Sequence, residues 1–69
     1  MNMWIIKDQA SYQITSANLH KKGDLHQVWV ERASGKTLLL HESTNEAEVR
    51  EVKDAIDYAI QNKIPTLNL

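Results

Sequence analysis

Three consecutive leucines, Leu38, Leu39 and Leu40, place the tightest constraint on how this chain can fold. They follow the turn signal Ala33-Ser34-Gly35, in a segment whose composition and flanks are typical of a strand. Because successive side chains of a strand point to opposite faces of a sheet, the run places leucine on both faces. One helix can cover only one face of a sheet. The sequence therefore raises the question of what covers the second face.

A helix follows the leucines, and it is the most regular pattern in the chain. Ser43 and Glu46 have the spacing of a capping box, with Thr44 as an alternative cap. The apolar residues after them fall within about 140° of one another on a helical wheel, which is typical of a helix with one core-facing stripe. These residues are Val49, Val52, Ala55, Ile56, Ala59 and Ile60. Pro65 stops the helix. We predict a helix over about residues 44–62, ending at Asn62 or Lys63, and a tail over residues 63–69.

The strand signals all lie before this helix, within residues 3–42. Short β-prone runs are separated by Lys7-Asp8-Gln9, by the segment around Gly23 and by Ala33-Ser34-Gly35. The chain is expected to be one domain over residues 1–69. The predicted fold class is α+β, with a small antiparallel sheet of three to four strands in β-β-β-α order and one C-terminal helix packed on one face.

The pairing of the strands depends on the lengths of the two loops that contain glycine. Both can form three-residue loops with glycine last, Lys21-Lys22-Gly23 and Ala33-Ser34-Gly35. Val30 then lies opposite Leu38, Val28 opposite Leu40, and Ile14 beside Val30. The helix is expected to lie on the apolar face that results, made of Ile14, Val28, Val30, Leu38 and Leu40. In the competing register a two-residue turn, Ser34-Gly35, pairs Val30 with Leu39 and mixes the faces.

In the preferred register the second face of the sheet carries four large apolar residues, Leu19, Leu25, Trp29 and Leu39, with Thr15 and Ala17 nearby. Three covers stay open: the tail around Leu67 and Leu69, the segment from Trp4 to Ile6, or another molecule. Trp29 can equally be explained by core packing. Tyr58 lies outside the apolar stripe of the helix, where it is either a contact residue or a scattered surface aromatic.

Composition excludes few functions. The formal net charge is −1 and there is no cysteine, which rules out disulfides and cysteine-based zinc sites and suits a reducing cytoplasm. Residues 1–42 hold five basic and four acidic groups, and residues 43–69 hold three and five, so neither part forms a clear polyanion-binding surface. No secretory signal is expected, because the short apolar run at Trp4 has no basic start and charge follows it after three residues. No membrane span is expected, because no long apolar run is present.

The patterns that could carry chemistry are weak. A metal site would need His26 and His41 on one face with His20, but the preferred register puts His26 with Val28 and His41 with Trp29, on opposite faces. The Gly35-Lys36-Thr37 triplet lacks the earlier glycine and the following helix of a phosphate-binding loop. The sequence therefore predicts no metal ion, no cofactor and no enzyme.

Two binding functions remain. We expect a non-enzymatic cytoplasmic module that associates with itself or binds a protein through the second sheet face, with Tyr58 as a further contact residue. The alternative is a nucleic-acid-binding domain that uses its sheet face, with Trp29 stacking on a base. Its phosphate contacts would come from the cations beside the two turns, Lys21, Lys22, Arg32 and Lys36.

Overall fold

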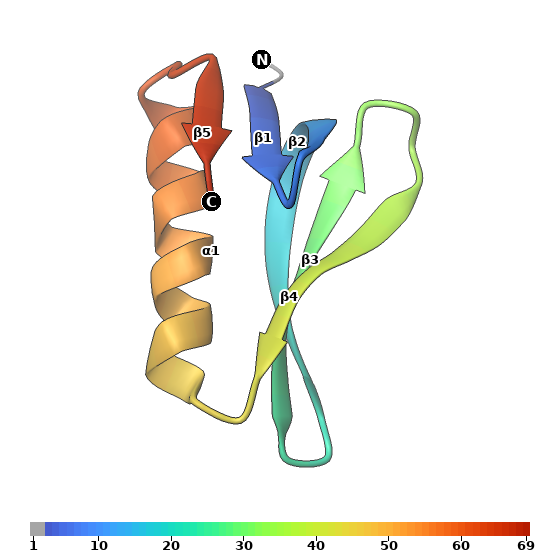
Figure 1. Ribbon diagram of the computed structural model, residues 1–69, viewed down its shortest axis with the longest axis vertical. Helices are drawn as coiled ribbons and strands as arrows, with labels where there is room; N and C mark the ends of the chain where they lie inside the picture. Colours follow the sequence, from blue (N-terminus) through green and yellow to red (C-terminus); the bar gives the residue numbers. More distant parts are fainter. Residues whose placement is uncertain (1–2) are drawn as a thin grey trace.

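The computed structural model describes residues 3–69, which form five strands and one helix. Figure 1 shows a sheet with a long protruding hairpin and a helix standing along one side. The elements in chain order are β1 (Met3–Lys7), β2 (Ala10–Lys22), β3 (Leu25–Arg32), β4 (Thr37–Ser43), α1 (Glu46–Gln61) and β5 (Thr66–Asn68). The α+β class is confirmed, and the predicted helix is two residues too long at its start and one at its end.

The five strands form one mixed sheet in the order β4-β3-β2-β1-β5. Strands β1 to β4 pair antiparallel with their neighbours in sequence, whereas β5 lies parallel to β1. The prediction of three to four strands in β-β-β-α order was therefore incomplete. Leu67 of the tail pairs with Ile5 and packs against the core, so the tail supplies the fifth strand.

The turns decide the register. Asp8 and Gln9 form a two-residue turn with φ of 53° and 67°, the left-handed region that the tight hairpins require. Ala33-Ser34-Gly35 is the predicted three-residue loop: the Gly35 N–H donates to Arg32 O at 2.8 Å, and Gly35 takes a φ of 90°. The predicted Lys21-Lys22-Gly23 loop was wrong, because the two strands pair as far as Lys22 and Leu25 and only Gly23-Asp24 turns the chain.

Two β-bulges overturn part of the predicted pairing. Val30 lies opposite Leu38 as predicted, but the register then shifts, so that Val28 lies opposite His41 and Leu40 is the extra residue. A second shift near Thr15 places Ile14 opposite Arg32, so Ala17 and not Ile14 lies opposite Val30. Binary hydrophobic patterns do not reveal such an extra residue, and from that point on it moves every following side chain to the face opposite the one that strict alternation predicts.

The helix cap lies one or two residues later than its predicted positions, Thr44 and Ser43. Asn45 is the N-cap: its side-chain oxygen accepts from the Glu48 N–H at 3.3 Å. Ser43 accepts from the Asn45 N–H at 3.0 Å and so supports the cap instead of forming it. At the other end Asn62 is the C-cap, as predicted, and Lys63 has a φ of 56° that turns the chain back towards β5.

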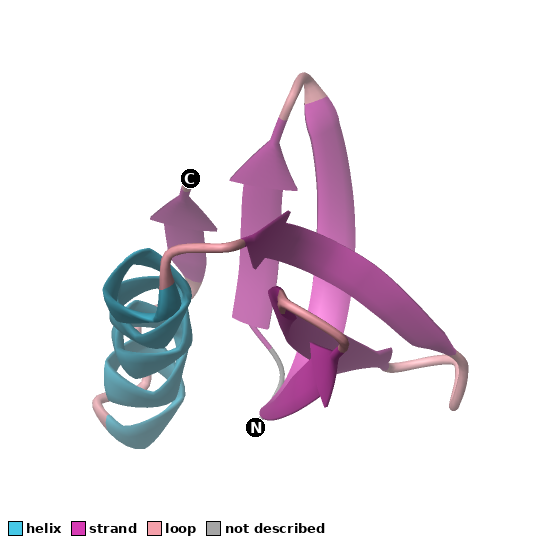
Figure 2. Ribbon diagram, turned by 90° about the horizontal axis from the view of Figure 1, so that it is seen from below, coloured by secondary structure: helices cyan, strands magenta, loops and turns pink. Residues whose placement is uncertain are grey.

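The core lies between the sheet and one side of α1. Figure 2 shows the helix on one side of a strongly twisted sheet, with β4 crossing β1 and β2 steeply. The predicted face is confirmed: Ile14, Val28, Val30 and Leu40 are buried in the core and Leu38 packs against it. The helix contributes Val49, Ile56 and Ala59, and β1 adds Met3 and Ile5. The side of the sheet turned away from α1 is called the open face below.

Candidate functional site

An apolar cluster lies at the middle of the open face. Trp29 lies directly opposite Leu39, and Leu25 is on the same side of β3 because side chains alternate along a strand. All three are half-buried, and together they line a hollow of the surface. They are called the Trp29 cluster, and they are three of the four residues predicted for this face.

A buried glutamine, Gln27, makes hydrogen bonds to the cluster and to a carboxylate beside it. Gln27 lies between Leu25 and Trp29 on β3, with only 4% of its surface exposed. Its Oε1 accepts from Trp29 Nε1 at 2.9 Å, and its Nε2 donates to Glu42 Oε2 at 3.0 Å. The amide therefore fixes the indole ring and orients a carboxylate at the rim. Trp29 is therefore partly packed into the protein and partly exposed on the open face. Both explanations that the sequence left open, core packing and a surface contact, apply to it.

Polar and charged residues surround the cluster. The same hollow is lined by His20 and Lys22 from β2 and by Glu42 from β4. Lys22 pairs with Leu25 on one flank of β3, whereas Glu42 pairs with Gln27 on the other flank. Among the described residues, the hollow is thus flanked by one lysine and one carboxylate on opposite sides of its apolar centre.

Two predicted contact residues do not join this cluster. Leu19 lies opposite Val28, so its side chain belongs to the helix-facing side, and its prediction for the second face was wrong. The cause is the bulge near Thr15, which also places Ala17 opposite Val30 and buries it in the core. Tyr58 is 63% exposed on the helix and is separate from the Trp29 cluster.

Neither end of the described chain covers the open face. β1 and β5 lie side by side in the plane of the sheet and extend it, so the two covers considered for the termini are wrong over residues 3–69. Trp4 instead lies on the open face itself, because it pairs with Gln13, whose neighbours face the core. It is 44% exposed and lies beside the Ala33-Ser34 turn, away from the Trp29 cluster.

The four cations of the nucleic-acid alternative are not brought together. Lys21 pairs with His26 and faces the helix side, whereas its neighbour Lys22 faces the open side. Arg32 lies 5.8 Å from the ring centre of Tyr12, and Lys36 follows the turn at the other end of β3. The Trp29 cluster has Lys22 as its only neighbouring cation among these four, together with the carboxylate of Glu42.

His26 lies on the face of Val28 as predicted, but the predicted face of His41 was wrong, because the bulge at Leu40 shifts the end of β4 and places His41 opposite Val28. His26 and His41 both lie on the helix-facing side, next to the first turn of α1. His26 Nε2 is 3.7 Å from Glu46 Oε2, and His41 Nε2 is 3.8 Å from Glu48 Oε1. No group of three or more potential metal ligands occurs within residues 3–69.

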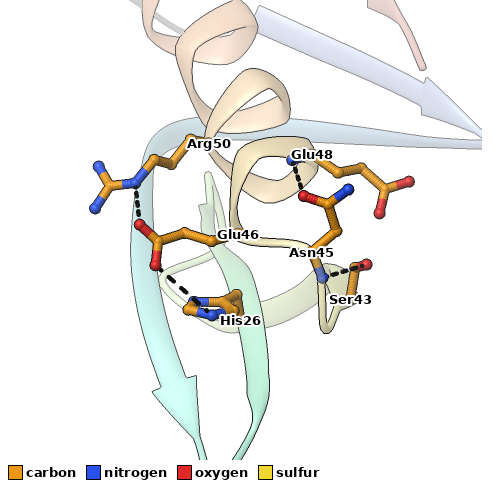
Figure 3. A network of polar contacts seen from close by, with 6 residues as sticks. All are labelled: His26, Ser43, Asn45, Glu46, Glu48 and Arg50. Atoms are coloured by element: carbon orange, nitrogen blue, oxygen red, sulfur yellow. Dashed lines mark hydrogen bonds and ion pairs between the residues drawn. The ribbon is translucent and has the colours of Figure 1, made fainter.

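Glu46 connects this region to the helix surface. Arg50 Nε donates to Glu46 Oε1 at 2.9 Å, while His26 lies near the other carboxylate oxygen, as Figure 3 shows. The hydrogen bond and the positive charge of Arg50 lower the pKa of the Glu46 carboxyl, and His26 acts in the same direction. Glu46 and Arg50 have the i,i+4 spacing at which oppositely charged side chains meet on a helix.

Over residues 3–69 the structure contains no helix with the length and apolar character that crossing a membrane requires. Comparison with models of known protein families, with characterised proteins and with solved structures found no match.

Proposed function

We propose that this protein is a non-enzymatic interaction module that associates with a second copy of itself through the open face of its sheet. The observation that carries the proposal is the Trp29 cluster, an apolar centre that no described segment covers and that has opposite charges on its two flanks. Apolar surface ringed by polar residues is the usual composition of a binding surface.

The arrangement of charge favours a second copy over an unrelated partner. A two-fold axis that lies between two facing sheets and runs along β3 brings the β2 flank of one copy over the β4 flank of the other. Lys22 of each copy then approaches Glu42 of the other. The two residues are offset by two positions along β3, about 7 Å at the usual strand rise, which a lysine side chain can span. One face thus forms two equivalent ion pairs with its own copy.

The size of the chain supports the same proposal. Ten described residues form the buried apolar core, and the sequence contains no cysteine that could add a disulfide. Domains of this size commonly obtain part of their burial from oligomerisation. The cytoplasmic setting is part of the proposal and is supported by the lack of cysteine.

The surface chemistry supports a binding role more than a catalytic one. The His26–Glu46 pair is the closest approach to an acid–base pair, but Glu46 is half-exposed and engaged by Arg50. General acid–base catalysis relies on groups whose pKa values are tuned by an enclosed environment. The cations of the nucleic-acid alternative are dispersed over both sides of the sheet. They do not form one positive surface for a phosphate backbone, so a protein partner is favoured.

Sedimentation equilibrium over a wide range of concentration at physiological salt tests the proposal. We expect a dimer whose fraction rises with concentration. Trp29→Ala should weaken self-association more than it destabilises the monomer, because the ring lies at the proposed interface. A chain that stays monomeric at all concentrations, or a Trp29→Ala variant that loses its fold without any change in oligomeric state, would refute the proposal.

Charge reversal tests the two-fold arrangement itself. Lys22→Glu and Glu42→Lys should each weaken the dimer, because each brings like charges together twice. A mixture of the two variants should form a heterodimer in which both ion pairs are restored, and the double variant should regain the homodimer. Lys36→Glu, which lies at the other end of β3, serves as the control. If the mixture associates no better than its components, the proposed arrangement is wrong.

A further inference from the structure

The longest strand of the sheet has a free edge. β2 has 13 residues, and β1 pairs only with residues 10–14 of it. Over residues 16–22, β2 pairs with β3 on one side and with no other strand in the described part of the chain. An unpaired strand edge presents backbone donors and acceptors that can pair with another extended segment.

The turn at Gly23-Asp24 shows which residues present those groups. In a hairpin with a two-residue loop, the residues flanking the loop form a hydrogen-bonded pair, here Lys22 and Leu25. Hydrogen-bonded and non-hydrogen-bonded pairs then alternate along an antiparallel ladder. Leu19 and Lys21 therefore direct their backbone N–H and C=O groups outward, away from β3.

The side chains of these two residues line a groove between β2 and the first turns of α1. The groove has a volume of about 260 Å³, and its lining includes Leu19, Lys21 and His26 from the hairpin and Glu46, Val49 and Arg50 from the helix. Leu19 is 40% exposed and Val49 is buried, so they provide an apolar floor. This volume is below the roughly 300 Å³ at which small-molecule pockets begin, and it suits one or two side chains of an extended segment.

The charge of the groove is positive. Lys21 makes no side-chain hydrogen bond or ion pair with any residue that the structure describes. Arg50 uses its Nε for Glu46, and its two terminal nitrogens point outward from that contact (Figure 3). Among the described residues that line the groove, Glu46 is the one carboxylate, and it is already engaged by Arg50 and His26. Two cationic groups therefore stay available to a ligand.

We propose that this groove binds an acidic, extended segment of another protein as an added strand on the free edge of β2. The backbone of the segment pairs with Leu19 and Lys21. An apolar side chain lies on Leu19 and Val49, and a carboxylate meets Lys21 and Arg50. Strand addition of this kind takes its affinity from main-chain hydrogen bonds and its specificity from alternate side chains. The site uses the side of the sheet opposite the Trp29 cluster, so it does not depend on the proposed dimer.

The test uses two blocked seven-residue peptides. In one, valine and aspartate alternate on one face of the extended chain and threonine occupies the other face; in the second, lysine replaces aspartate. We expect the acidic peptide to shift the backbone amide NMR signals of Leu19, Lys21 and Arg50 and to leave the Trp29 indole signal in place. Its affinity should be at least tenfold higher than that of the basic peptide. Absence of binding, or equal binding of both peptides, would overturn the proposal.

Variants separate the two parts of the recognition. Lys21→Glu should lower the affinity for the acidic peptide about tenfold and raise that for the basic peptide. Lys21→Pro removes the ammonium group together with an outward N–H that the fold does not use, which an edge strand tolerates; it should abolish the binding that Lys21→Glu only weakens. Lys22→Glu is the matched control: its side chain lies on the open face, so groove binding should not change even though the proposed dimer weakens.

Two further outcomes would replace the proposed ligand. A single-stranded oligonucleotide that shifts the same signals more strongly than the acidic peptide would assign the groove to a phosphate backbone. Signals of Leu19 and Lys21 that change when the protein alone is diluted would assign it to a second copy. Either result would overturn the assignment to an acidic protein segment, whatever the charge-reversal mixture shows about the open face.

Discussion

The hydrogen bond between Gln27 and Trp29 makes it possible to measure how much a buried polar contact on the open face contributes to the free energy of unfolding. Gln27 Oε1 accepts from Trp29 Nε1 at 2.9 Å, and the amide is almost completely buried. Trp29→Phe removes the donor, and Gln27→Leu removes the acceptor. A hydrogen bond between neutral groups contributes about 1 kcal/mol to stability, and a buried group left without its partner costs about 1–3 kcal/mol.

Each single variant should therefore lower the free energy of unfolding by about 1–2 kcal/mol. Gln27→Leu should cause the smaller loss, because the indole that it leaves without an acceptor is half exposed. The double variant should cost about 1 kcal/mol less than the sum of the two, because it leaves neither partner unsatisfied. Total stability for a chain of 69 residues is of the order of 3–10 kcal/mol, so these effects are large enough to measure.

Urea unfolding followed by circular dichroism provides the measurement, at a protein concentration low enough to keep the chain monomeric. Fluorescence is unsuitable because Trp29 itself is replaced. The control is Tyr58→Phe on the exposed face of the helix, which should change stability by less than about 0.5 kcal/mol. If the two single costs add within about 0.3 kcal/mol, the amide and the indole are not coupled and the reasoning is refuted.

Three further predictions concern local structure. Gln9→Gly should stabilise the chain by about 0.5–1 kcal/mol in thermal or urea unfolding, because Gln9 holds a φ of 67° that favours glycine; a loss of stability would contradict the turn geometry. Asn45→Ala should lower the free energy of unfolding by about 1 kcal/mol and Ser43→Ala by less, because Asn45 is the N-cap. A larger loss for Ser43→Ala would show that Ser43 is the cap, as expected from the sequence. The pKa of Glu46 is lowered in the folded chain, so its contribution to stability is present above the unfolded pKa and is lost as the pH falls through the folded one. Glu46→Gln should therefore make unfolding less sensitive to pH in the acid range, and an unchanged pH profile would show that Arg50 gives the carboxyl no net stabilisation.

The helix and the loop at Ala33-Ser34-Gly35 could be predicted because each depends on local rules. The apolar stripe of α1 and the stop at Pro65 lie within one stretch of sequence, and Gly35 supplies the positive φ that its loop requires. The pairing of Val30 with Leu38 followed directly from that loop. These features need no knowledge of distant parts of the chain.

The remaining register could not be predicted, because bulges and parallel pairing depend on contacts across the fold. The extra residue at Leu40 brings His41 opposite Val28, and no residue type in the sequence signals it. The bulge near Thr15 likewise moved Leu19 from the open face to the helix side. The parallel strand β5 has only three residues, and its partner β1 lies at the opposite end of the chain.

The alternation of side chains along β4 answers the question raised by the three leucines. Leu38 and Leu40 both reach the core, and Leu39 alone lies on the open face. The apolar centre of that face is therefore smaller than the sequence suggested, since Leu39 shares its hollow with only two described apolar residues, Leu25 and Trp29, while Trp4 lies away from it.

This small surface determines what kind of dimer to expect. The three residues of the Trp29 cluster are already half-buried, so self-association removes only on the order of 100–200 Å² of their apolar area per copy, well below the roughly 800 Å² per partner of a standard interface. Most of the contact must come from polar residues around the cluster. Such residues fix the relative position of the two copies more than they add to the affinity. We therefore expect a weak dimer that forms and dissociates in the micromolar to millimolar range, about 4–8 kcal/mol of binding free energy. Salt should weaken the dimer of the unchanged chain and strengthen that of the Lys22→Glu variant, because it screens the Lys22–Glu42 attraction in the first and the like-charge repulsion at Glu42 in the second.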